Sequence, residues 1–173
     1  LNVLDTNVKV CVGFNWRFHP LIRFIKREVD SGYFGEIQYA SLSAREWVPK
    51  IAPNAWIESG SHILDTARYL FGQLHSYGKH EWQYGLAWLA SASLIANERE
   101  PAFGVEIHVN CCNRDEYDYR IVIQGSKRSV TCNIPQEHQQ MHFREMQSFL
   151  GDQQGLATLQ DGVENIRLLA AGL

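Results

Sequence analysis

The stretch WIESGSHILDTARYLFG, residues 56–72, predicts a helix from about residue 58 to the glycine that closes it. At about 100° per residue, Glu58, His62 and Asp65 fall within one narrow sector of that helix. The opposite side is apolar and carries Ile63, Leu64, Ala67, Leu70 and Phe71. Because an apolar side must face the core, the polar sector is expected to face water, a cleft or a partner.

The polar sector has a chemistry of its own. A histidine titrates near neutral pH, so His62 can accept or donate a proton during a reaction. A carboxylate one turn away, from Glu58 or Asp65, can hold the imidazole tautomer and stabilise its protonated form. No second histidine on this helix completes a zinc-like ligand set. The spacing leaves two interpretations open, an acid–base site or the solvated face of an ordinary helix.

The segments before this helix predict a strand, a helix and a longer strand. KVCVGFNWRF, residues 9–18, is typical of a short strand that runs into a loop. HPLIRFIKREVDSG follows with an amphipathic helical pattern, in which Pro20 suits the first turn and Gly32 the C-terminal cap. GEIQYASLSAREW, residues 35–47, is rich in β-forming residues and predicts a long strand.

The segments after it are mostly strands. Period-two patterns predict strands at residues 91–98, 103–112, 117–125 and 129–134, with 117–125 returning as the hairpin partner of 103–112. Two helices close the chain. One spans residues 142–150, and the other begins at an Asp161 N-cap.

This separation of strands from helices predicts an α+β fold, an open and mainly antiparallel sheet with helices packed on one face.

Composition describes one ordinary domain. The chain has 173 residues, 45% hydrophobic and 20% charged, with a net charge of −3. That charge excludes the basic footprint of a nucleic-acid or anionic-membrane binder. No apolar run approaches the ~20 residues of a membrane span, so the simplest expected localisation is cytoplasmic. None of the four cysteines forms a CxxC pair, so we expect reduced thiols and no metal site.

Four segments, in this order, resemble one known family: VGFNWRFHP, IKREVDSGYFGEI, ESGSHILDTARYLFG and IVIQGSKRSV. They are similar to the C-terminal domain of the glucose–fructose oxidoreductase / inositol dehydrogenase / MocA family of NAD(P)-dependent oxidoreductases. The closing FREMQSFL and DGVENIRLLAAGL also resemble the family's last helices. The resemblance implies an open sheet whose free face builds a homo-oligomer, at least a dimer.

The resemblance also implies roles for single residues. His62 matches the family's catalytic histidine, and Glu58 stands where the motif usually has an aspartate. Arg17 and Asn15 match motif positions near where substrate and nicotinamide meet, and we assign them to substrate binding. Asp65 matches the motif's later aspartate, and we assign it to substrate binding as well, with a structural role as the alternative. Trp47 could stack on the sugar ring that the resemblance implies, although packing in the core or at an interface is the favoured explanation for a tryptophan.

Some features of the family are missing from this sequence. It contains no GxGxxG, no Glu-Lys-Pro motif, and no glycine run at residues 52–54. We therefore expect residues 1–14 to be a remnant of the last helix and strand of a Rossmann domain. Residues 15–173 would then form the substrate-binding and oligomerisation domain.

The expected function follows from these features. The chain would be the substrate-binding and oligomerisation half of a sugar- or cyclitol-type oxidoreductase, with a small polyol or sugar as its ligand. It would hold no cofactor itself and be inactive alone, although the resemblance implies NAD or NADP for a complete enzyme. The alternative is a stand-alone dimeric assembly or small-ligand-binding module derived from that domain.

Overall fold

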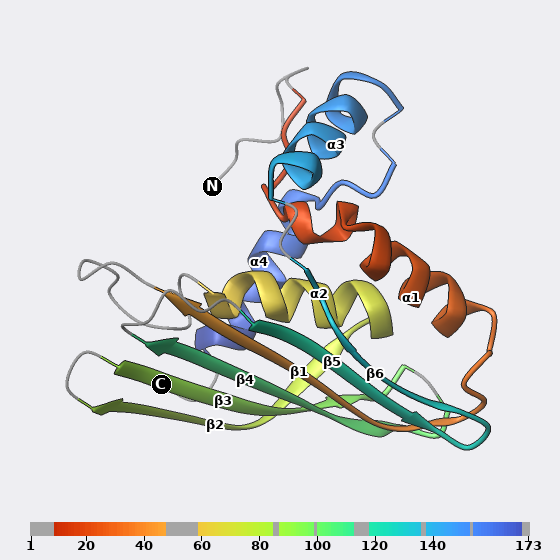
Figure 1. Ribbon diagram of the computed structural model, residues 1–173, viewed down its shortest axis with the longest axis vertical. Coiled ribbons are helices and arrows are strands. Elements are labelled where there is room, and N and C mark those ends of the chain that lie inside the picture. The colour runs from red at the N-terminus through yellow and green to blue at the C-terminus, as the bar shows by residue number, and fades with distance from the viewer. Residues whose placement is uncertain are drawn as a thin grey trace.

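One open sheet carries all the described helices on one of its faces (Figure 1). The computed structural model describes residues 9–47, 59–84, 87–98, 100–112, 118–135, 138–152 and 154–170. Within these residues no helix is long and apolar enough to span a membrane.

The elements alternate at first and then separate into strands and helices. In chain order they are the 3-10 helix η1 (Asn15–Phe18), α1 (Pro20–Asp30), β1 (Ile37–Trp47), α2 (Ser61–Phe71), β2 (Leu74–Tyr84), β3 (Ala87–Ala96), β4 (Phe103–Cys112), β5 (Asp118–Gly125), β6 (Ser129–Asn133), α3 (His138–Leu150) and α4 (Leu159–Ala170). The six described strands run in the order β2-β3-β4-β1-β5-β6. Only the β1–β4 pair is parallel, so the α+β fold with a mainly antiparallel sheet is confirmed.

The predicted hairpin between residues 103–112 and 117–125 is wrong. β1 lies between these two strands, and Leu42 pairs with Ile107 on one side and with Ile121 on the other. A turn signal cannot distinguish a hairpin from a connection that skips one strand. A connection that skips one strand must cross two strand spacings, about 10 Å, and five residues are enough for that distance.

The edge strand β2 was not predicted. Its sequence, LHSYGKHEWQY, lacks a clean apolar alternation. Most of its described side chains are exposed or half-buried, as suits a strand with a neighbour on one side only. The short strand predicted within residues 9–18 is reduced to one bridge between Val12 and Ala157, because the next residues turn into η1.

The core lies between the sheet and the helices. Alternate strand residues point to the helix side and are buried, among them Leu42, Ile107 and Ile121. α1 contributes a buried stripe, as its pattern predicted. α2 lies deepest, in contact with β1 and β4 on one side and with η1, α1 and α4 on the others.

Gly125 provides a test of how tightly the sheet end is packed. A Cβ at this position would overlap the backbone carbonyl oxygen of Phe34, which cannot move without shifting the turn before β1. We expect Gly125→Ala to lower the free energy of unfolding by about 1–3 kcal/mol. Gly104→Ala is the matched control, since a Cβ there meets nothing within 4 Å. Urea unfolding of both variants measures the difference, and equal stability would refute this account.

Candidate functional site

His62 is the second residue of α2, which begins at Ser61 after its N-cap Gly60. The imidazole is half-buried, and its ring meets the Phe14 ring edge-on at 5.7 Å between centroids. Glu58, the acid expected beside it, lies outside the described residues. The structure therefore shows the candidate proton-transfer group without the partner that the sequence proposed for it.

Asp65 does not face water, a cleft or a partner, so the helical-wheel prediction is corrected here. Its carboxylate is 0% exposed and accepts two hydrogen bonds from Arg17, from Nε at 2.8 Å and from Nη2 at 2.6 Å. η1 supplies this guanidinium and covers the polar side of α2. Two residues assigned to substrate binding are thus paired with each other in the interior.

The ion pair continues into a network with α4. The third nitrogen of Arg17, Nη1, lies 3.3 Å from Asp161 Oδ2, and Arg68 donates to the Asp161 carbonyl and to Asn165 Oδ1, both at 2.9 Å. Asn165 in turn donates to the Ser61 carbonyl at 3.4 Å. Because Ser61 precedes His62, this network ties the first turn of α2 to α4.

Asp161 serves this network from a different helical position than predicted. α4 begins at Leu159, and Thr158 caps it. Asp161 accepts hydrogen bonds from the backbone N–H and the hydroxyl of Thr158, which forms a capping box. Asp161 is therefore in the first turn rather than at the N-cap, and its carboxylate still reaches Arg17.

Burial and charge act against each other in the pair. Burial lowers the pKa of the Arg17 guanidinium, but the hydrogen bonds and charge of Asp65 outweigh it and raise that pKa above its ordinary value. Burial likewise raises the pKa of the Asp65 carboxyl, although Arg17 opposes the shift. Burial also works against ionisation of Asp161, but its bonds to Thr158 and the charge of Arg17 hold its pKa below the ordinary value.

Asn15 contacts a residue that the sequence did not bring to notice. Its side-chain amide is 3% exposed and donates to His142 Nε2 on α3 at 3.0 Å, while its Oδ1 has no partner among the described residues. Glu145 follows one turn later, and its carboxylate lies 3.9 Å from His142 Nδ1. Burial raises the pKa of the Glu145 carboxyl, with His142 opposing and Asp65 adding to the shift.

The sequence offered few signals for these missed residues. His142 was one of several scattered histidines, and Asn165 was one polar residue in a helical repeat. An asparagine on the same helical face as Leu168 and Leu169 is a signal that could have identified Asn165. Trp47 ends β1, and its side chain lies outside the part of the chain that the structure describes.

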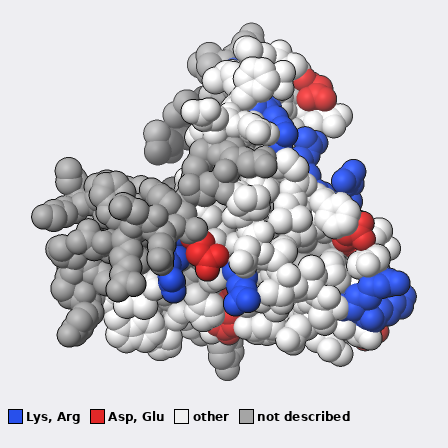
Figure 2. All heavy atoms as spheres, viewed as in Figure 1, with Lys and Arg blue, Asp and Glu red and all other residues white. Residues whose placement is uncertain are grey.

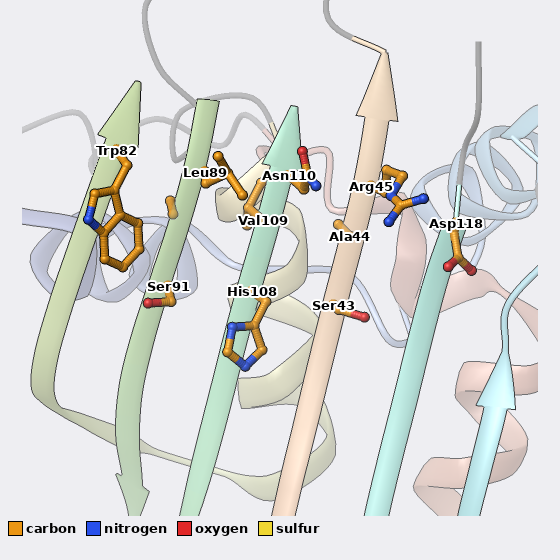
Figure 3. A pocket seen from close by; sticks show the side chains of 11 residues that line it. Ser43, Ala44, Arg45, Trp82, Leu89, Ser91, His108, Val109, Asn110 and Asp118 are labelled. Carbon is orange, nitrogen blue, oxygen red and sulfur yellow. The ribbon is translucent and has the colours of Figure 1, made fainter. Parts of the chain in front are cut away.

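The free face of the sheet is hollowed into an open depression of about 610 Å³ (Figure 3). Trp82 on β2 and Leu89 on β3 line one side, and His108 projects from the middle of β4. Arg45 on β1 and Asp118 on β5 line the other side from opposed positions in the sheet. The sheet separates the depression from α2, which lies behind it in this view.

The described residues can be tested as a site for two kinds of ligand, a metal ion and a dinucleotide. The described residues hold no group of three metal-binding side chains. A dinucleotide normally places its pyrophosphate on a free helix N-terminus. Here the Leu21 N–H at the start of α1 is bound by His19 Nδ1, and the start of α4 is capped by Thr158 and Asp161. The starts of α1 and α4 therefore offer no such site, and we derive no step through a dinucleotide.

Comparisons with known proteins point to a class of oxidoreductases. No family model matches the sequence. An inositol 2-dehydrogenase of Rhizobium meliloti (strain 1021) is 27% identical over 154 residues, an alignment that covers 74% of this chain and 42% of that protein. The resemblance to the C-terminal domain of the glucose–fructose oxidoreductase / inositol dehydrogenase / MocA family is therefore confirmed, and the homologues are inositol dehydrogenases.

Solved structures share the fold. A Corynebacterium glutamicum ATCC 13032 myo-inositol dehydrogenase matches with a TM-score of 0.73 at 17% identity, over 92% of this chain and 60% of that one. A Lactobacillus casei myo-inositol dehydrogenase, in complex with NAD(H) and myo-inositol, matches with a TM-score of 0.74 at 15% identity, over 93% and 57%. At these identities the likeness shows the fold alone, and the chain spans less than two thirds of each protein.

The buried ion pair yields a prediction for stability. Arg17→Met leaves the Asp65 carboxylate buried without its partner, and we expect it to cost about 3–5 kcal/mol of unfolding free energy. The double variant Arg17→Met with Asp65→Leu should cost much less than the sum of the single changes. Urea unfolding of the wild type, Arg17→Met, Asp65→Leu and the double variant forms a double-mutant cycle.

The matched control breaks an exposed pair. Lys26→Met removes the Lys26–Asp30 contact at 2.6 Å on the surface of α1, and we expect a loss below about 1 kcal/mol. Additive costs for Arg17 and Asp65 would contradict the coupling proposed between them.

Proposed function

We propose that this chain is the substrate-binding and oligomerisation part of an NAD(P)-dependent oxidoreductase that acts on a cyclitol or a related polyol. The observation that carries the proposal is the position of His62 in the first turn of α2, in a chain homologous to inositol dehydrogenases. NAD(H) and myo-inositol are the ligands named for one structural relative.

His62 suits the proton-transfer role. α2 is buried on the side of the sheet and on the side of η1, yet His62 at its start remains half-buried rather than enclosed. The Arg17–Asp65 pair and the Asn165–Ser61 contact fix the turn that carries it. A histidine held in this way can accept the proton of a substrate hydroxyl as that carbon is oxidised.

The cofactor would supply the hydride acceptor. The starts of α1 and α4 are capped by their own side chains, and we propose that residues outside this chain hold the cofactor and that the chain alone catalyses no turnover. What this chain contributes is the substrate wall, the proton acceptor and a surface for assembly.

A chimera tests the role of His62. We would join the part of the Rhizobium meliloti inositol 2-dehydrogenase that precedes the matched region to residue 1 of this chain. We expect NAD⁺ reduction that depends on myo-inositol, and a kcat at least about 100-fold lower in His62→Ala. His75→Ala is the control, because His75 is an exposed histidine on β2. Equal kcat in the His62 variant, or no turnover by the chimera with any cyclitol, would refute the proposal.

The free sheet face is the proposed oligomer surface. No described helix covers this face. Its depression combines the apolar side chains of Trp82 and Leu89 with a positive charge at Arg45 and a negative charge at Asp118. A surface that meets its own copy across a two-fold axis must be self-complementary, and such a mixture allows it. Flat sheets with exposed large apolar residues are typical association surfaces.

Light scattering tests this surface. We expect the wild-type chain to be a dimer or a larger even assembly, and Leu89→Asp to shift it toward monomer by at least tenfold in dissociation constant, about 1.4 kcal/mol. Phe24→Asp on α1 is the control, since Phe24 is similarly exposed but lies on the helix side. A monomeric wild type, or equal effects of both changes, would exclude the sheet face as the interface.

A further inference from the structure

His108 lies at the centre of the depression on the free sheet face (Figure 3). Its side chain is exposed, and its Cα partners on the two neighbouring strands are Ser91 on β3 and Ser43 on β1. Both serines are small and uncharged, so the imidazole projects from the floor of the depression between them. Any surface that closes over the depression must therefore meet this imidazole.

Four charged residues around His108 balance one another while its ring is uncharged. Arg45 on β1 and Asp118 on β5 are Cα partners at one end of the depression. Arg120 lies on β5 in the same cross-strand row as His108, and Glu106 lies two residues before His108 on the same face of β4. These four residues contribute two positive and two negative charges. Figure 2 shows side chains of both signs close together over the sheet.

Acid adds positive charge to this face. A histidine ring gains a proton and a charge as the pH falls from about 8 to about 5. A second histidine, His80 on β2, lies in the same cross-strand row as His108 and stacks on Trp82 with 5.6 Å between the ring centroids. β3, between the two histidines, has no charged residue, and Glu106 already accepts a hydrogen bond from Ser93 Oγ at 3.1 Å. Protonation of the two histidines therefore makes a balanced face positive.

Two-fold symmetry brings the centre of such a face into contact with itself. A residue near the two-fold axis of a dimer meets the same residue of the second copy, whereas a residue far from the axis meets a different one. When the axis passes through the centre of the depression, the two His108 rings face each other whatever the direction of the axis within the interface. Arg45 and Asp118 lie to one side of the centre and can therefore meet groups of opposite charge. Two charged imidazoles at the centre can meet only each other, and like charges that face each other oppose association.

We propose that His108 makes association across the free sheet face sensitive to pH, so that two copies bind while both rings are uncharged and separate when the rings are protonated. This inference rests on the proposed function and adds regulation to its oligomer surface. In separate chains the charged ring is exposed to water, but in the dimer it would lie opposite a second charge with less water around it. Protonation therefore favours the separate chains, and the association constant falls with the pH across the range in which histidine titrates.

Sedimentation velocity at two pH values tests this inference. We expect the dissociation constant of the wild-type dimer to be at least about tenfold higher at a pH of about 5.5 than at a pH of about 8. His108→Gln keeps a polar side chain without a titrating ring, and it should remove most of this difference. The matched control is His142→Gln, because His142 is an exposed histidine on α3, on the helix side of the sheet, and this variant should keep the full difference. Circular dichroism at both pH values checks that each chain stays folded. If His108→Gln weakens association at both pH values, the ratio of its two dissociation constants still decides.

The outcomes separate this proposal from the proposed function. A dimer that Leu89→Asp dissociates, but whose dissociation constant is the same at both pH values, would overturn the role of His108 and leave the free face as the interface. A full pH dependence in His108→Gln would overturn it as well, since another group would then be titrating. Tighter association in acid would show that the charged ring meets a carboxylate of the second copy, which also overturns the proposal. A wild-type chain that is monomeric at both pH values would overturn the assembly on the free face, and this inference with it.

Discussion

The buried pair of Arg17 and Asp65 is the constraint on which the arrangement of the helices depends. Two opposite charges in the interior are stable only while they satisfy each other, since either charge alone would remain desolvated. The pair joins η1 to the middle of α2, and Asp161 extends it to α4. Three elements that are distant in sequence therefore have one relative position in which all the charges are paired.

This constraint explains why the start of α2 suits a reactive group. A side chain that moves protons must stay within hydrogen-bond reach of its substrate, so the backbone that carries it has to be held. The sheet holds α2 from below through Ile63 and Leu64, and the ion pair holds it from above. His62 lies at the start of α2, and the buried side chains of the helix hold it in place.

Local signals in the sequence predicted individual elements better than their arrangement. α1 follows from Pro20 at its start and the glycine after its end, and the predicted bounds of β4 and the predicted end of β1 match the structure because both strands have clear patterns. A period-two pattern tells which side of a strand faces the core, but not which strand is its neighbour, so the insertion of β1 between β4 and β5 was missed. The burial of Asp65 was missed for a similar reason. A helical wheel describes one helix, and the second layer formed by η1 and α4 depends on contacts between residues 48 and 144 positions apart in the sequence.

The same reasoning explains why two surfaces remain that the internal packing does not use. A sheet covered by helices on one side leaves its other face free, and a helix placed over η1 leaves its outer ridge free. The free sheet face and the outer ridge of α3 lie at opposite ends of the molecule (Figure 1). Contacts made on one of these surfaces would therefore not compete for space with contacts made on the other. Neither surface includes the first turn of α2, so contacts on them would leave His62 outside both.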